Sequence, residues 1–101
     1  MNDFLEAARM LRAYCPTEFP VMVRRVSLKD GFFGDCSKGE KAFLVRVNKA
    51  LDKDFQIWVL VHEYAHAMAW GFEGMHESEH TPHFGVCYAR AYNAVFDPGA
   101  V

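Results

Sequence analysis

The segment His62-Glu63-Tyr64-Ala65-His66 contains the side chains of this sequence that are best suited to chemistry. On an α-helix, where successive residues are about 100° apart, His66 lies about 40° from His62 and Glu63 lies about 60° further round. Two neutral imidazoles on one arc can bind a tetrahedral zinc ion, and the carboxylate beside them stays free to take a proton from a water on the metal. This spacing is typical of the metal-binding helix of metallopeptidases.

The residues around this motif favour a buried helix. Residues 55 to 70 are apolar on nearly all sides, so we expect this helix to cross the centre of the domain. His62, Glu63 and His66 would then be polar groups in apolar surroundings, where polar groups need partners. A shared metal ion is the simplest partner, and a hydrogen-bonded pair of core histidines is the other interpretation.

A catalytic zinc ion also needs a third protein ligand and an open fourth position. Possible ligands crowd the segment after the helix: Glu73, His76, Glu77, Glu79, His80 and His83. Chain length cannot choose among them, because the residues between His66 and His80 can extend over about 45 Å. We favour His80 because it precedes Thr81-Pro82, a helix start that can hold its imidazole in place. His76, His83 or a loop glutamate could still replace it.

The remaining patterns predict a single α+β domain over residues 1–101. Residues 3–14 have helical spacing, which ends at Cys15-Pro16 because proline disfavours helix in the residue before it. Residues 19–28 are rich in β-branched side chains, residues 42–48 alternate between two faces, and Asp30-Gly31 after the first of these strands is a two-residue hairpin signal. We therefore expect a three-stranded antiparallel sheet from residues 19–28, 32–36 and 42–48.

Capping signals bound the two later helices. Asp52 or Asp54 can cap the helix of the His-Glu motif, and Gly71 ends it. Thr81 and Pro82 suit the cap and first position of a C-terminal helix. The apolar stripe of that helix is more typical of core packing than of a cofactor surface; it consists of Phe84, Cys87, Tyr88, Ala91, Tyr92 and Val95.

Composition restricts the possible partners and surroundings. The chain has 101 residues, of which 51% are hydrophobic, and this is enough for one compact domain. Its net charge of −2 offers no general attraction for nucleic acid, so we expect no strong binding. Cys15, Cys36 and Cys87 are odd in number and lack C-x-x-C spacing, which favours reduced thiols and a cytoplasmic location. No signal peptide or membrane-spanning stretch is expected.

The motif residues together resemble the SprT-like (Spartan-like) zinc metallopeptidases. In that family an H-E-x-x-H helix is followed, after a similar gap, by an H-G-x-x-F element, and His80-Thr81-Pro82-His83-Phe84 takes its place here. The resemblance covers chiefly residues 55–93. It implies a small zincin-like catalytic domain with zinc on His62, His66 and His80 and with Glu63 as catalytic base. Thr81 replaces the usual glycine, and the nucleic-acid-binding segments of many relatives have no counterpart, so a repair role is not implied.

The sequence therefore predicts a zinc-dependent endopeptidase, with Zn²⁺ as its cofactor. The resemblance to zincin-like folds implies an extended or unfolded polypeptide substrate that pairs with residues 42–48 as an edge strand. Two alternatives stay open. The three histidines could hold a structural zinc in a non-catalytic binding module, or the site could hydrolyse a non-peptide amide.

Overall fold

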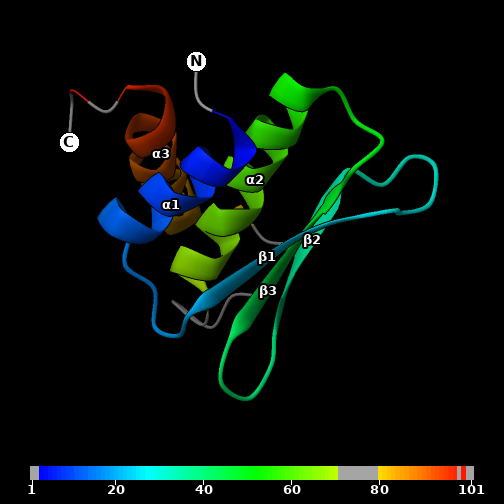
Figure 1. Ribbon diagram of the computed structural model, residues 1–101. Helices are drawn as coiled ribbons and strands as arrows, with labels where there is room; N and C mark the ends of the chain where they lie inside the picture. The colour runs from blue at the N-terminus through cyan, green and yellow to red at the C-terminus, as the bar shows by residue number, and fades with distance from the viewer. Residues whose placement is uncertain (1–2, 71–79, 98, 100–101) are drawn as a thin grey trace.

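The computed structural model describes residues 3–70, 80–97 and 99, which form an α+β fold (Figure 1). Its elements follow in the order α1 (Phe4–Tyr14), β1 (Val21–Val26), β2 (Gly34–Lys38), β3 (Phe43–Asn48), α2 (Lys53–Ala69) and α3 (Pro82–Phe96). The predicted types and order of these elements are confirmed. None of the described helices is both long enough and apolar enough to cross a membrane.

The sheet is mixed, so the predicted antiparallel sheet is wrong. β3 lies between the other two strands, parallel to β1 and antiparallel to β2. Val45 of β3 is opposite Val23 on one side and opposite Cys36 on the other. The outer strands are thus two strand spacings apart, about 9.6 Å, a distance that a two-residue hairpin cannot bridge.

The Asp30-Gly31 signal does form a turn, although not the predicted hairpin. The Phe32 amide donates to the Lys29 carbonyl at 3.0 Å, and Gly31 has a φ of 89°, which side chains rarely allow. The turn lies within the connection from β1 to β2, which passes the end of β3. There the Asn48 side-chain amide donates to the Phe32 carbonyl at 2.9 Å and holds the connection in place.

β3 is central because it is the most apolar of the three strands. Its Phe43, Val45 and Val47 are fully buried, whereas β2 buries only Cys36. A strand with polar and charged residues suits a sheet edge. The prediction that residues 42–48 form the edge strand is therefore wrong, and β2 and β1 are the outer strands of the described sheet.

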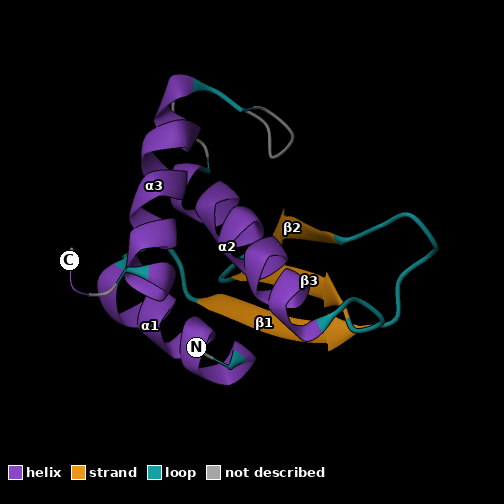
Figure 2. Cartoon of the chain, turned by 90° about the horizontal axis from the view of Figure 1, so that it is seen from above, coloured by secondary structure: helices purple, strands orange, loops and turns teal. Residues whose placement is uncertain are grey.

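The core lies around α2, which packs between the sheet and the helices α1 and α3 (Figure 2). Leu60 and Val61 are fully buried, and the hydroxyl of buried Tyr64 donates to the Cys15 carbonyl at 3.0 Å. The predicted central position of this helix is confirmed. Because α2 is held on two sides, the backbone of its histidines has a fixed place relative to β2 and α3.

The predicted N-terminal caps of α2 and α3 are also present, whereas Gly71, predicted to end α2, lies outside the described residues. The Asp52 carboxylate accepts from the Asp54 amide at 3.2 Å, and the Thr81 hydroxyl accepts from the Phe84 amide at 3.2 Å. Pro82 occupies the first turn of α3. The predicted apolar stripe of α3 contributes to the core through Phe84, Cys87, Ala91 and Val95.

Candidate metal centre

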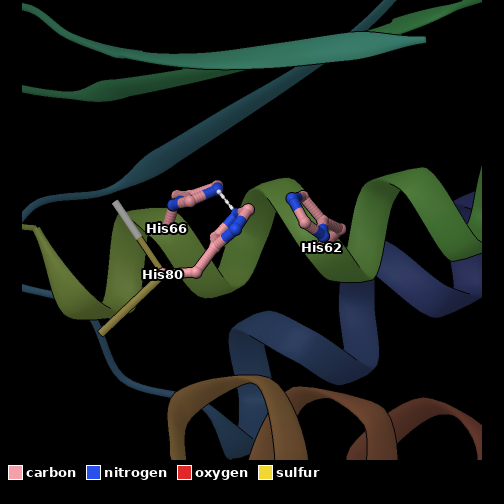
Figure 3. Close-up of side chains that lie close together, drawn as sticks. All are labelled: His62, His66 and His80. Atoms are coloured by element: carbon pink, nitrogen blue, oxygen red, sulfur yellow. Dashed lines mark hydrogen bonds between the residues drawn. The ribbon is translucent and has the colours of Figure 1, made fainter. Parts of the chain in front are cut away.

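The structure brings His62, His66 and His80 together at one point. His62 and His66 are one turn apart on α2, and His80 directly precedes the cap of α3 (Figure 3). One ring nitrogen from each histidine can be chosen so that the three atoms lie within 4.8 Å of one another. The three histidines therefore lie close enough to bind one metal ion.

The spacing of His66 and His80 fits two ligands of a tetrahedral ion. Their Nε2 atoms are 3.3 Å apart. Two nitrogens at the usual zinc–nitrogen distance and at the tetrahedral angle would be about 3.3–3.4 Å apart. The ring centre of His62 is 5.0 Å from that of His66 and 5.2 Å from that of His80, so a third nitrogen is within reach of the same ion.

The protonation of these histidines also fits a metal. Burial, followed by the neighbouring His62 and His80, lowers the pKa of His66 to about 4. Burial and His80 lower the pKa of His62. Both rings are thus neutral near pH 7, which is the form that binds metal. The buried Nδ1 of His66 has no hydrogen-bond partner in the described part of the chain, so the hydrogen bonds of this ring are incomplete.

Phe84 supports all three rings, a role that the sequence did not reveal. Its side chain is 6% exposed, and its ring centre lies 4.4 Å from that of His66, 4.7 Å from His80 and 5.5 Å from His62. The cap between Thr81 and the Phe84 amide fixes the start of α3 beside these rings. Phe84, the last residue of the His80–Phe84 element, therefore packs against all three rings of the cluster.

The other predicted ligands do not join this cluster within the described residues. His83 lies on α3, where its Nε2 is 3.6 Å from the sulfur of Cys87. His76 and the glutamates Glu73, Glu77 and Glu79 lie in residues 71–79, outside the described parts of the chain. His80 is accordingly the third residue of the described cluster.

Glu63 lies beside the cluster without being part of it. Burial, with a smaller contribution from Asp35 of β2, raises its pKa to about 7. A carboxyl group with this pKa can both accept and return a proton at neutral pH, as a general base must. Asp35 itself accepts two hydrogen bonds from the Arg46 guanidinium. No sequence signal places Asp35 near Glu63, because the two residues meet only through the packing of β2 on α2.

A pocket of about 380 Å³ opens next to Glu63. Its walls come from α2, α3 and the start of β2, and its lining residues are Phe33, Gly34, Phe55, Trp58, Val59, His62, Glu63 and Tyr88. Glycine is required at position 34, because a Cβ atom there would lie 2.5 Å from the Arg46 carbonyl oxygen and 2.7 Å from the Val59 side chain. Two tyrosines of the predicted α3 stripe differ in position: Tyr88 lines this pocket, whereas Tyr92 packs against Trp58.

The chain matches no protein-family model, and no curated protein or solved structure is significantly similar to it. The resemblance to SprT-like metallopeptidases therefore depends on the motif residues alone. The geometry and chemistry of the site are the remaining indications of function.

Proposed function

We propose that this protein is a zinc-dependent endopeptidase with a zincin-like site similar to that of SprT-like metallopeptidases. The observation that carries the proposal is the three-histidine cluster with Glu63 in the wall of the adjoining pocket. Structural zinc sites commonly have four protein ligands, whereas catalytic sites have three and an open position. Three imidazoles, two of them at tetrahedral spacing, suit zinc, and the free carboxyl group beside them suits hydrolysis.

When bound, zinc supplies a Lewis acid that polarises a carbonyl group and lowers the pKa of water towards about 7. Glu63 supplies the proton transfers. Its carboxylate takes a proton from the attacking water as the water oxygen bonds to the peptide carbonyl carbon. It then gives this proton to the peptide nitrogen as the C–N bond breaks, which yields a carboxyl and an amine product.

The outer edge of β2 offers a place for the substrate backbone. Among the described strands, β2 pairs only with β3, and its first residue, Gly34, lines the pocket that contains Glu63. An extended polypeptide that adds to this edge would run past the catalytic residue and bind through main-chain hydrogen bonds. Such binding favours unfolded substrates with little demand on sequence along most of their length. We therefore expect the substrate to pair with β2 and not with residues 42–48, which the sequence had suggested as the edge strand.

A purely structural metal is the main alternative, because His80 could link the start of α3 to α2. A structural metal site would not explain the free carboxyl group of Glu63 or the pocket beside it.

One experiment distinguishes the two proposals. Zinc-loaded wild-type protein and the Glu63→Gln variant are incubated with casein, and cleavage is followed by mass spectrometry. We expect peptide products from wild type and a loss of rate of about 10²–10⁴-fold in the variant. A Glu63→Gln protein that binds zinc and cleaves as fast as wild type would contradict the mechanism.

A further inference from the structure

The pocket beside Glu63 has mostly aromatic walls. Phe33 comes from the segment before β2, Phe55 and Trp58 from the first turns of α2, and Tyr88 from α3. Phe33, Phe55 and Trp58 are 52%, 39% and 40% exposed, although they are large apolar side chains. Single exposed apolar residues are common, but several around one hollow mark a binding surface.

Contacts between rings hold these walls in place. Phe33 and Phe55 pack edge to face, with ring centres 5.1 Å apart. Trp58 is backed by α3, where it stacks on Phe96 at 4.6 Å and contacts Tyr92 at 5.4 Å. Phe33 and Phe55 therefore support each other, and Trp58 has partners outside the pocket, so the hollow does not depend on a ligand to hold its rings. A preformed apolar hollow of about 380 Å³ is typical of ligand sites.

Few of the residues that line the pocket can carry a charge. Among the described lining residues, only His62 and Glu63 are ionisable near neutral pH, and His62 belongs to the histidine cluster. In the part of the chain that the structure describes, no lysine or arginine lines the pocket, so an acidic side chain would find no cation there and would meet Glu63. An aromatic side chain can instead pack edge to face against the ring walls.

We propose that this pocket receives a large apolar side chain, preferably aromatic, from the substrate residue next to the scissile bond. This inference rests on the proposed peptidase function and adds a specificity pocket to it. His62 and Glu63 line the pocket and also adjoin the reaction centre, so a residue whose side chain fills the pocket has its backbone beside Glu63. Edge-strand pairing along β2 then binds the chain without regard to sequence, and the pocket selects the bond that is cut.

Binding can be measured separately from catalysis. The probes are the N-acetyl amides of phenylalanine, lysine, aspartate and alanine, added to metal-free wild-type protein, which keeps Glu63 and cannot turn the probes over without zinc. The signal is the NMR shift of the Trp58 indole N–H, with the indole of Trp70, which does not line the pocket, as an internal reference. We expect the phenylalanine probe to bind at least 5-fold more tightly than the other three. Equal binding of all four, or preference for lysine or aspartate, would overturn the inference.

Two neighbouring phenylalanines provide matched variants. Phe33 lines the pocket, whereas Phe32 is 57% exposed and does not. Phe33→Ala should weaken binding of the phenylalanine probe at least 5-fold, and Phe32→Ala should leave it unchanged. An equal loss in both variants would mean that general surface hydrophobicity, and not the pocket, binds the probe.

Cleavage sites supply the second readout. In zinc-loaded wild-type protein, casein should be cut beside Phe, Tyr, Trp, Leu or Met, and Phe33→Ala should broaden this preference while Phe32→Ala keeps it. Cleavage without preference for apolar neighbours would overturn the pocket assignment and leave the peptidase proposal standing. If the phenylalanine probe binds but casein is not cleaved, the pocket is a binding site for apolar side chains and the proposed peptidase function is wrong.

Discussion

The Nε2 atoms of His66 and His80 lie 3.3 Å apart although the residues are 14 positions apart in the chain. One comes from the last part of α2 and the other from the residue before the cap of α3, so the packing of these helices creates the pair (Figure 3). Without a metal, one ring can only donate a single hydrogen bond to the other. With a metal, both nitrogens become ligands at the separation that a tetrahedral ion requires.

Glu63 and His66 make opposing contributions to the pH dependence of folding in the metal-free protein. Burial lowers the pKa of His66 from 6.5 to about 4, so the unfolded chain binds more protons between these pH values and stability rises with pH. Burial raises the pKa of Glu63 from 4.5 to about 7, so the folded chain binds more protons and stability falls as pH rises. The two effects oppose each other between pH 4.5 and 6.5.

The Glu63→Gln variant should therefore reveal the contribution of His66. From pH 4 to 6.5, the free energy of unfolding of this variant without metal should increase by up to about 3 kcal/mol. His62, whose pKa is also lowered, adds in the same direction. Wild type should change much less over this range. Urea unfolding at several pH values, with a chelator present, measures both proteins. Parallel curves for the two proteins would contradict these opposite shifts.

Gly34 should tolerate no side chain. A Cβ atom at this position would lie 2.5 Å from a backbone oxygen of β3, which cannot move without disturbing the sheet. We expect Gly34→Ala to lower the free energy of unfolding by about 1–3 kcal/mol. Gly85 on α3 is the matched control, because a Cβ atom there meets nothing within 4 Å. Gly85→Ala should raise stability by up to about 1 kcal/mol through helix propensity. Urea unfolding that shows equal effects at both glycines would refute the close approach of β2 and α2.

Substrate folding should control the rate of cleavage. Pairing along the outer edge of β2 needs an extended segment of several residues, which a tightly folded protein does not offer. Zinc-loaded protein should therefore cut casein efficiently and leave a stable folded protein intact under the same conditions. The folded protein should become a substrate after reduction and denaturation. Equal cleavage of its folded and unfolded forms would argue against recognition by strand addition.

Nucleic acid should bind weakly at physiological salt. The net charge is −2, and the Arg25 guanidinium in the basic Arg24-Arg25 pair already lies 4.5 Å from the centre of the Phe4 ring. Neither feature provides a basic surface on which a phosphate chain could bind. Fluorescence anisotropy with labelled single-stranded DNA gives the affinity. Sub-micromolar binding would contradict this expectation.

Local signals predicted the helices and the site better than they predicted the sheet. The His62–His66 spacing and the Thr81-Pro82 cap each depend on a few neighbouring residues, and both are present as expected. Strand order depends on contacts between distant segments, so the Asp30-Gly31 turn suggested a hairpin that does not form. The contrast between polar β2 and apolar β3 was a usable signal for which strand is central.

The surroundings of Glu63 could not be predicted from the sequence for the same reason. Asp35 and Phe33 come close to Glu63 only because β2 packs on α2, and that packing requires the glycine between them at position 34. Phe84 belonged to a recognised element, yet its contact with all three histidine rings follows from how α3 crosses α2. The motif residues were therefore predictable from the sequence. The residues that shift the pKa of Glu63 or pack against the histidine rings were not.

Zinc stoichiometry tests the central claim, a metal ion held by His62, His66 and His80. Elemental analysis after zinc loading and desalting should give one zinc per chain for wild type and for His83→Ala, because His83 lies outside the cluster. The His80→Ala variant should lose the metal or bind it at least 100-fold more weakly in titrations against a competing chelator. Circular dichroism should confirm that all three proteins are folded. Full zinc occupancy and unchanged affinity in His80→Ala, or loss of zinc only in His83→Ala, would contradict the account.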